Sequence, residues 1–241
     1  MSEPASVPDP ASGLPIGPEA SGHPAPRPQR KVLEGARVRL EPLDPARHGD
    51  ALWEESHGPD KDVVWQYLFE PPFPDRAAFQ AHLERKAASE DPLFFAVVDK
   101  ARDRALGYQT LMRIDTTHRV IEVGNVMYGT GLQRTPLSTE AQYLFARHVF
   151  DDLGYRRYEW KCNALNAPSR RTADRLGFTF EGIFRQHMIV RGRNRDTAWF
   201  SMIDTEWPTI RAGFEAWLAP SNFDAAGRQK ASLADLRAAA A

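Results

Sequence analysis

The stretch "LQRTPLSTEAQYLFARHVF", Leu132–Phe150, reads as a turn that leads into the first turn of a helix. Helix N-termini are good phosphate sites, because their free N–H groups and the helix dipole both favour an anion. A phosphate loop of this kind normally carries glycine, but Pro136 stands in its place. Proline lacks an N–H, although its fixed φ suits the first helical turn. Two interpretations stay open: a variant phosphate site that binds its ligand, or a helix start that binds nothing.

Segments on both sides of this stretch alternate between strand and helix patterns. The expected strands are Ala36–Leu43, Leu93–Lys100, Ala105–Ile114, Arg119–Gly129, Tyr155–Ala164, Phe180–Val190 and Thr197–Asp204. The expected helices, besides the one that runs from the quoted loop to about Leu153, are Pro45–Ser56, Asp75–Ser89, Asn166–Phe178, Pro208–Leu218 and Ser232–Ala240. This order predicts an α/β (α+β) layer fold around one mixed sheet.

Composition excludes several classes of protein. The chain has 241 residues, enough for one domain or at most two, and its net charge of -1 makes a nucleic-acid partner unlikely on charge alone. The single cysteine, Cys162, excludes an intrachain disulfide and a cysteine zinc cluster. The seven histidines show no metal-ligand spacing, so no metal is expected.

Residues 1–30 are rich in Pro, Ala, Ser and Gly and are expected to form a disordered or extended tail. The alternative is a proline-rich ligand for a partner. The predicted division is this tail over 1–30, a folded domain over 31–207 and a helical extension over 208–241. No apolar run approaches the roughly 20 residues of a membrane span, and no signal peptide is evident, so a cytoplasmic protein is expected.

Several short motifs follow one another in a fixed order. A strand with Glu122 precedes the quoted loop, whose helix contains Thr139-Glu140-Ala141, and after one more strand comes "NAPSRRTADRLGFTFEG", Asn166–Gly182. In this order they resemble the GCN5-related N-acetyltransferases (GNAT), and most of all the branch with the ribosomal-protein N-terminal (alanine/serine) acetyltransferases. The resemblance spans roughly residues 35–207.

The resemblance implies a single GNAT-like domain with a mostly antiparallel mixed sheet of about seven strands flanked by helices. It also implies transfer of an acetyl group from acetyl-CoA to a primary amine, by direct attack in a ternary complex. The amine is a protein N-terminus or a small molecule. No membrane partner is expected, and a homodimer is compatible with the resemblance.

The resemblance further implies the residues that bind acetyl-CoA. In the loop these are Gln133, Arg134, Thr135, Leu137, Ser138 and Thr139, with Pro136 and Ser138 where the family has small residues. The N–H groups of the last three are expected to face the pyrophosphate. Backbone groups of Val126, Met127 and Tyr128 are expected beside the pantetheine arm, where this strand separates from its neighbour. Asn166 and Ser169 complete the set, although helix capping alone also explains both.

Two residues are catalytic candidates by the same resemblance. Glu122 is the expected general base, acting through a water, and a surface ion pair is the alternative. Strand alternation predicts Glu122, Gly124 and Val126 on one face, with residues 123, 125 and 127 on the other. Ser169 is the expected donor to the CoA sulfur, because Ala173 stands where many members carry an acidic tyrosine.

Two further groups have both a structural and a functional interpretation. Around the hairpin turn "RGRN" lie Arg185, Arg191, Arg193 and Arg195, which form either a solvated turn or a positive edge for an acidic substrate or the CoA 3′-phosphate. Trp53, Trp65, Tyr67 and Phe69 fit a helix–sheet core or the lining of a cleft, which His187 could also reach. The alternatives to an enzyme are a non-catalytic CoA- or partner-binding protein and an RNA-associated factor.

Overall fold

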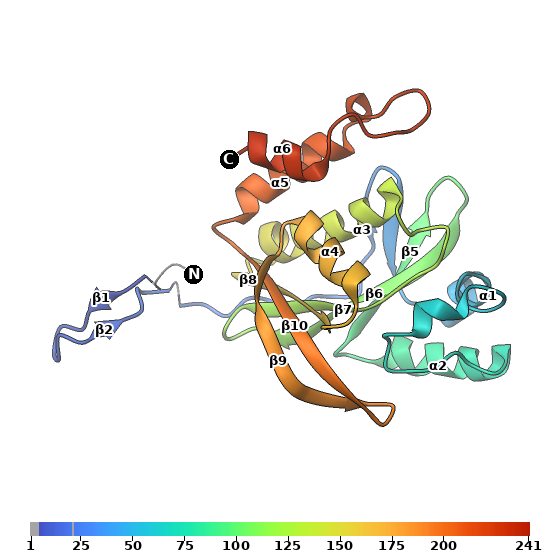
Figure 1. Ribbon diagram of the computed structural model, residues 1–241, viewed down its shortest axis with the longest axis horizontal. Helices are drawn as coiled ribbons and strands as arrows, with labels where there is room; N and C mark the ends of the chain where they lie inside the picture. Colours follow the sequence, from blue (N-terminus) through green and yellow to red (C-terminus); the bar gives the residue numbers. More distant parts are fainter. Residues whose placement is uncertain (1–4, 21) are drawn as a thin grey trace.

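A central sheet of eight strands forms the frame of the molecule in the computed structural model, which describes residues 5–20 and 22–241 (Figure 1). Its strand order is β3-β4-β5-β6-β7-β8-β10-β9, and only the β7–β8 pair is parallel. The strands are β3 (Leu33–Glu34), β4 (Val38–Pro42), β5 (Leu93–Asp99), β6 (Arg104–Asp115), β7 (Val120–Tyr128), β8 (Arg157–Asn163), β9 (Thr179–Val190) and β10 (Arg193–Ile203). The mixed, mostly antiparallel sheet is confirmed. In this sheet, β3 was not foreseen, because it has two residues and is too short for an alternation pattern.

Within the described residues, six α-helices flank the sheet. They are α1 (Pro45–Ser56), α2 (Arg76–Ala88), α3 (Pro136–Arg147), α4 (Ala167–Leu176), α5 (Trp207–Leu218) and α6 (Leu233–Ala239). α3 continues into a π-helical turn, His148–Asp152. The predicted helices therefore exist within a few residues of their expected bounds.

Two hydrophobic clusters hold these layers together. The larger lies between one face of the sheet and α3, and it includes Phe145 of α3 and Trp207 and Phe214 of α5. The smaller lies against the other face, where Leu52 of α1 and Phe79 of α2 pack. The helices after residue 207 thus share the main core of the domain.

The N-terminal segment contains a small hairpin and then an extended stretch. Its described residues form a small hairpin, β1 (Val7–Pro8) with β2 (Pro15–Ile16), which projects from the domain (Figure 1). The following residues are extended along the domain: Ala25 is buried, and its N–H donates to Thr116 O at 2.9 Å. Arg27 and Arg30 donate to carbonyls of the 89–90 turn. These polar contacts connect the extended stretch to the domain. Residues 1–4 and 21 of the predicted tail lie outside the described residues.

Helix capping positions the ends of the helices. Asp44 and Asp75 accept first-turn N–H groups of α1 and α2, and Asn166 does the same for α4. α4 ends at Gly177, whose φ of 101° is a left-handed conformation that favours glycine. α3 is different, because its N-cap residue Thr135 makes no side-chain cap hydrogen bond.

Candidate active site

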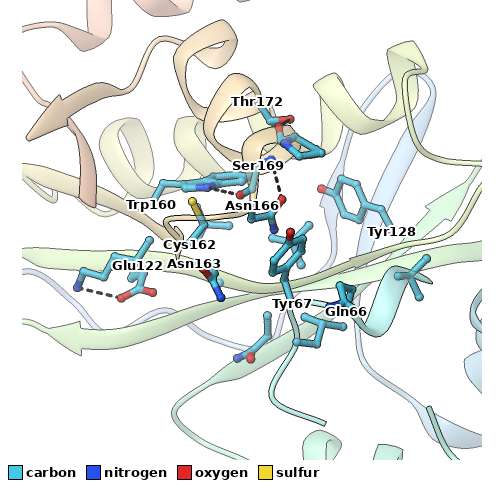
Figure 2. Close-up of a pocket in the computed structure, with 18 of the residues that line it drawn as sticks. Gln66, Tyr67, Glu122, Tyr128, Trp160, Cys162, Asn163, Asn166, Ser169 and Thr172 are labelled. Carbon is cyan, nitrogen blue, oxygen red and sulfur yellow. Dashed lines mark hydrogen bonds and ion pairs between the residues drawn. The ribbon is translucent and has the colours of Figure 1, made fainter. Parts of the chain in front are cut away.

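The two parallel strands separate in the middle of the sheet. β7 and β8 pair only from Val120 with Arg157 to Val123 with Trp160. Beyond these pairs β7 continues to Tyr128 and β8 to Asn163, with no pairing between them. The strand separation that the resemblance implied is therefore confirmed. A cleft of about 750 Å³ occupies the gap and is lined from both strands (Figure 2).

A β-bulge in β7 controls which side chains line this cleft. Asn125 has a φ of 47°, and the pairing with β6 shifts register there. Val123 packs in the core beneath α3, and so do Val126 and Tyr128, whereas Met127 lies in the opposite core. Strict alternation past Gly124 was therefore a wrong expectation, because one extra residue reverses the faces.

The N-terminus of α3 opens on the cleft. Pro136 occupies its first position, and the N–H groups of Leu137 and Ser138 donate to none of the described residues. The Thr139 N–H was expected as a third free donor, but it is the first one that the helical ladder engages. The Thr139 side chain instead accepts from Arg175 Nη1 at 3.1 Å. This end of the cleft thus offers two free backbone donors.

Most of the expected cofactor residues share the cleft. Its walls include Glu122, Val126, Tyr128, Gln133, Arg134, Ser138, Thr139, Asn166 and Ser169. Met127, Thr135 and Leu137 are not among the lining residues. Arg171 and Arg175 of α4 also line it and were not foreseen. Together with Arg134, they give the cleft three guanidinium groups. The only sequence signal for the two arginines of α4 is that they are four residues apart, so they lie on one helix face.

The N-terminus of α4 supplies the opposite wall. Asn166 Oδ1 accepts the Ser169 N–H at 3.1 Å, so the capping interpretation is confirmed (Figure 2). Ser169 Oγ accepts the Trp160 Nε1–H at 3.0 Å, so its own proton points to another acceptor, and the buried Cys162 thiol lies beside this hydroxyl. Ala173, at the expected position of an acidic tyrosine, is buried in the core.

Glu122 lies at the gap as a buried carboxylate. Its Oε2 is 3.0 Å from Lys161 Nζ and 3.2 Å from Arg113 Nε, and the residue is 5 % exposed. Burial raises the pKa of Glu122, against the two cations, which lower it. The expected surface ion pair is thus a buried one, and Glu122 lines the cleft as well. Lys161 was missed, although a lysine inside the apolar strand "YEWKC" is a recognisable signal.

A loop between α1 and α2 forms the third wall. Tyr67 reaches across the cleft, where its hydroxyl donates to Leu165 O at 3.2 Å (Figure 2). Arg191 at the tip of the β9–β10 hairpin donates to Gln66 O at 2.6 Å. Tyr67 and Phe69 line the cleft, as does His187, whereas Trp65 is fully buried in the core.

Comparisons with known proteins agree with this geometry. Residues 37–179 match the acetyltransferase (GNAT) domain. A GCN5-related N-acetyltransferase from Brucella melitensis is 54% identical over 90% of this chain and 98% of its own, with a TM-score of 0.88. A GNAT-family protein from Chromobacterium violaceum, provisionally described as an acetyltransferase, is 40% identical over 80% of this chain and 98% of its own, with a TM-score of 0.74. No curated protein matches the chain.

These matches define the class of the protein as an acyl-CoA-dependent transferase. The chain belongs to the GCN5-related N-acetyltransferase family and is an acetyl-CoA-dependent acetyltransferase. A more distant structure, provisionally described as a ribosomal-protein-serine acetyltransferase from Vibrio cholerae, is 17% identical over 72% of this chain and 97% of its own, with a TM-score of 0.62, and shares the fold.

Two structural findings concern metals and membranes. Within residues 5–20 and 22–241, no three His, Cys, Asp or Glu side chains gather where a metal ion could be held. None of the helices in the described part of the chain has both the length and the hydropathy that a bilayer span requires.

Proposed function

We propose that this protein moves an acetyl group from acetyl-CoA to a primary amine, by direct attack of the amine on the thioester within a ternary complex. The observation that carries the proposal is the separation of β7 from β8 beside an uncapped helix N-terminus. A linear thioester can lie between the two strands, with its phosphates at the helix and its acetyl group at the gap.

The phosphates of acetyl-CoA would bind at the N-terminus of α3. Leu137 and Ser138 supply free N–H groups there, and Arg134, Arg171 and Arg175 supply positive charge. Pro136 removes one donor, which the three guanidinium groups compensate. The loop is therefore proposed to be a functional variant of the glycine-containing phosphate site.

The pantetheine arm and the thioester would lie along the unpaired part of β7. Backbone groups from Val126 to Tyr128 face no strand on the β8 side, so they can accept and donate hydrogen bonds to the arm. An N–H group there can also polarise the thioester oxygen as charge develops on it. Asn166 is proposed to contact a pantetheine amide through the NH₂ group that capping leaves free.

Glu122 and Ser169 would manage the protons. A carboxylate whose pKa is raised by burial is a better proton acceptor than a free one. Glu122 lines the cleft, and it would act there through a water. An α-amine with a pKa near ~8 needs less help than a lysine near ~10.4. Ser169 would donate a hydrogen bond from its hydroxyl group to the departing sulfur, and the serine would keep its proton.

The acceptor amine is proposed to be a protein N-terminus or a small molecule. The sequence does not choose between the two. A second candidate function is CoA or partner binding without catalysis, and the proline in the loop and the alanine at position 173 favour it.

The proposal is tested by isothermal titration of acetyl-CoA into the wild type, Ser138→Asp and Ser138→Ala. Aspartate in the first turn of a helix is favourable for folding, so it repels the phosphates without disturbing α3. We expect micromolar binding by the wild type and the alanine variant, and a loss of about tenfold or more with aspartate. Absence of binding by the wild type would contradict the proposal. Binding without acetylation of any amine in a broad screen would favour the non-catalytic candidate.

A further inference from the structure

The four arginines around the β9–β10 hairpin have very different surroundings. Arg185, Arg191 and Arg193 are exposed, so water can solvate their guanidinium groups. Arg195 is only 9 % exposed and lines the cleft. One of the four is therefore a buried cation inside the candidate active site.

Arg195 has no anionic partner within the described part of the chain. It makes no ion pair and donates no side-chain hydrogen bond to residues 5–20 or 22–241, and its Nε atom is buried without an acceptor. Its one specific contact is with the ring of Phe69, whose centroid lies 5.1 Å from the guanidinium carbon. Burial lowers the pKa of Arg195, and the charge of Glu122 acts against this effect without an ion pair. A buried, unpaired charge is costly, so its presence in a cleft points to a ligand that pairs with it.

The nearby carboxylate does not fill this role. Glu122 also lines the cleft, but its charge is shared by Lys161 at 3.0 Å and Arg113 at 3.2 Å. Lys161 lies in addition over the ring of Trp199, 3.7 Å from its centroid. Arg195 is thus an extra cation on a wall whose acidic charge is already balanced.

We propose that Arg195 binds the carboxylate of a small acceptor that carries both an amine and a carboxylate, as an amino acid does. This rests on the proposed function, since it assigns the acceptor of that same site. The guanidinium fork matches a carboxylate in a bidentate geometry. With the carboxylate at Arg195 and the amine at the gap beside Glu122, the acceptor would lie beneath Phe69.

The closure of the cleft favours a small acceptor over a polypeptide. Tyr67 bonds across it to Leu165 O, and Arg191 ties the hairpin to Gln66 O. The loop before α2 is therefore bonded to the α4 wall of the cleft and to the β9–β10 hairpin, which limits the room for a polypeptide. The phosphates of acetyl-CoA are the other source of negative charge, but they have their own cations at α3 and α4, Arg134, Arg171 and Arg175.

The test compares each of the twenty amino acids with its carboxamide as acceptor, together with short peptides, at saturating acetyl-CoA. The proteins are the wild type, Arg195→Met, which keeps the bulk, and Arg193→Met, an exposed control on the same hairpin. We expect the wild type to prefer one or more carboxylates over their amides by about tenfold or more, and Arg195→Met to lower their kcat/KM by about 30-fold or more, mainly through KM. Arg193→Met and the amide reactions should change by no more than about twofold.

Three results would overturn the inference. Equal use of acids and amides would show that no carboxylate is recognised, and better use of peptides would make the acceptor a polypeptide. A large loss of acetyl-CoA affinity in Arg195→Met, measured by titration, would make Arg195 a phosphate ligand. Failure of acetyl-CoA to bind the wild type would instead be a failure of the proposed function.

Thermal unfolding of the ligand-free proteins gives a readout that needs no turnover. Removing an unpaired buried charge should leave the midpoint of Arg195→Met equal to or above that of the wild type. A midpoint lowered by several degrees, with Arg193→Met unchanged, would show that Arg195 stabilises the fold and would overturn the inference. Titration of the amino-acid panel into the CoA-bound protein completes the test, and absence of any carboxylate binding would contradict it.

Discussion

Glu140 of α3 binds the backbone of Arg37, directly before β4, because its Oε2 accepts the Arg37 N–H at 2.7 Å. The same carboxylate accepts the N–H of Val38 at 2.8 Å and of Ala36 at 3.0 Å, and the residue is 4 % exposed. One carboxylate thus satisfies three backbone donors and fixes α3 against the sheet. Because the candidate phosphate site is the N-terminus of α3, this contact also positions the site.

Glu140→Ala is expected to destabilise the protein strongly. Three backbone donors would lose their acceptor, at a cost of about 3 kcal/mol in the free energy of unfolding. For a chain of this length that corresponds to a midpoint lowered by about 8 °C. Calorimetry against Glu84→Ala, an exposed glutamate on α2, is the measurement. Equal midpoints for the two variants would show that Glu140 does not anchor α3.

Glu122→Gln tests the proposed base. Since burial raises the pKa of Glu122, the wild-type kcat/KM should fall as the pH drops through that raised value and the carboxylate takes up a proton. In the variant, kcat/KM should be about 100-fold lower, and its pH profile should no longer fall on the acidic side. The part of the profile that reports ionisation of the acceptor amine, near ~8, should remain. A pH profile of both proteins separates the two limbs.

The control for this experiment is Glu159→Gln. Glu159 shares Lys161 with Glu122, at 2.6 Å, but does not line the cleft. It should therefore keep the acidic limb. If both glutamine variants retain the wild-type profile, Glu122 is an ion-pair residue and no base.

Ser169→Ala tests the donor to the leaving thiolate. A thiol with a pKa near ~8.5 leaves readily, so the expected loss in kcat is modest, about tenfold, with KM for acetyl-CoA little changed. Thr172→Val is the matched control, because its hydroxyl also lines the cleft but donates to Pro168 O within α4. Steady-state kinetics in which both variants lose activity equally would argue against a role for Ser169.

Local patterns predicted the elements of this fold but not the contacts between them. The turn residues and apolar periods that mark α1, α4 and the long strands are local in sequence, so they could be predicted. The bulge at Asn125 depends on how β7 pairs with β6, and no local pattern encodes it. Lys161 and Arg113 reach Glu122 from two other strands, so local sequence could not predict this buried ion pair either. The loop with Tyr67 has no periodicity, and its place over the cleft follows only from tertiary contacts.

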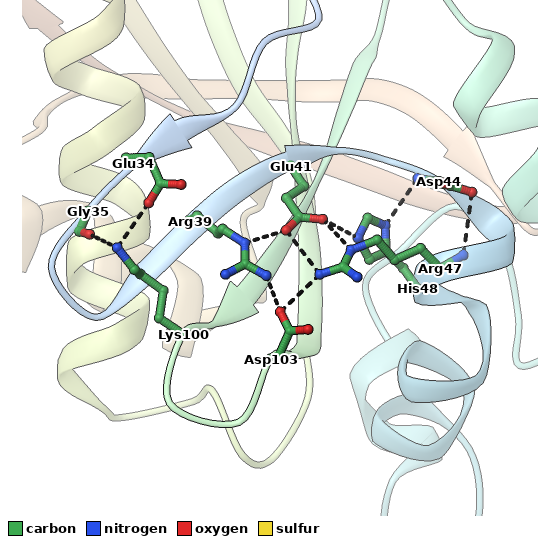
Figure 3. A network of polar contacts seen from close by, with 9 residues as sticks. All are labelled: Glu34, Gly35, Arg39, Glu41, Asp44, Arg47, His48, Lys100 and Asp103. Carbon is green, nitrogen blue, oxygen red and sulfur yellow. Dashed lines mark hydrogen bonds and ion pairs between the residues drawn. The ribbon is translucent and has the colours of Figure 1, made fainter.

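A charge cluster at the other end of the sheet links β4 to α1 (Figure 3). Glu41 accepts hydrogen bonds from Arg39, from Arg47 Nε at 2.7 Å and from His48 Nε2 at 2.9 Å. His48 Nδ1 accepts the Asp44 N–H at 3.1 Å, so the ring proton lies on Nε2 and points to Glu41. Asp103 joins both arginines. Burial alone would raise the pKa of Glu41, but the hydrogen bonds from Arg47, Arg39 and His48 outweigh it and lower the pKa to about 2.

This depressed pKa predicts a stability difference that depends on pH. Above the ordinary value of a glutamate, near ~4.3, the ionised Glu41 stabilises the folded state in full, and the contribution is lost as the pH falls toward about 2. We expect Glu41→Gln to cost about 1–2 kcal/mol at pH 7, less than the shift alone would give, because Arg47 is half-exposed and water screens the pair. Denaturant unfolding from pH 7 to pH 2.5 measures the difference, which should shrink below about pH 4.5. Asp50→Asn, in an exposed pair with Arg76, is the control. A difference that stays constant over the whole range would mean that the Glu41 carboxylate is not what holds β4 to α1.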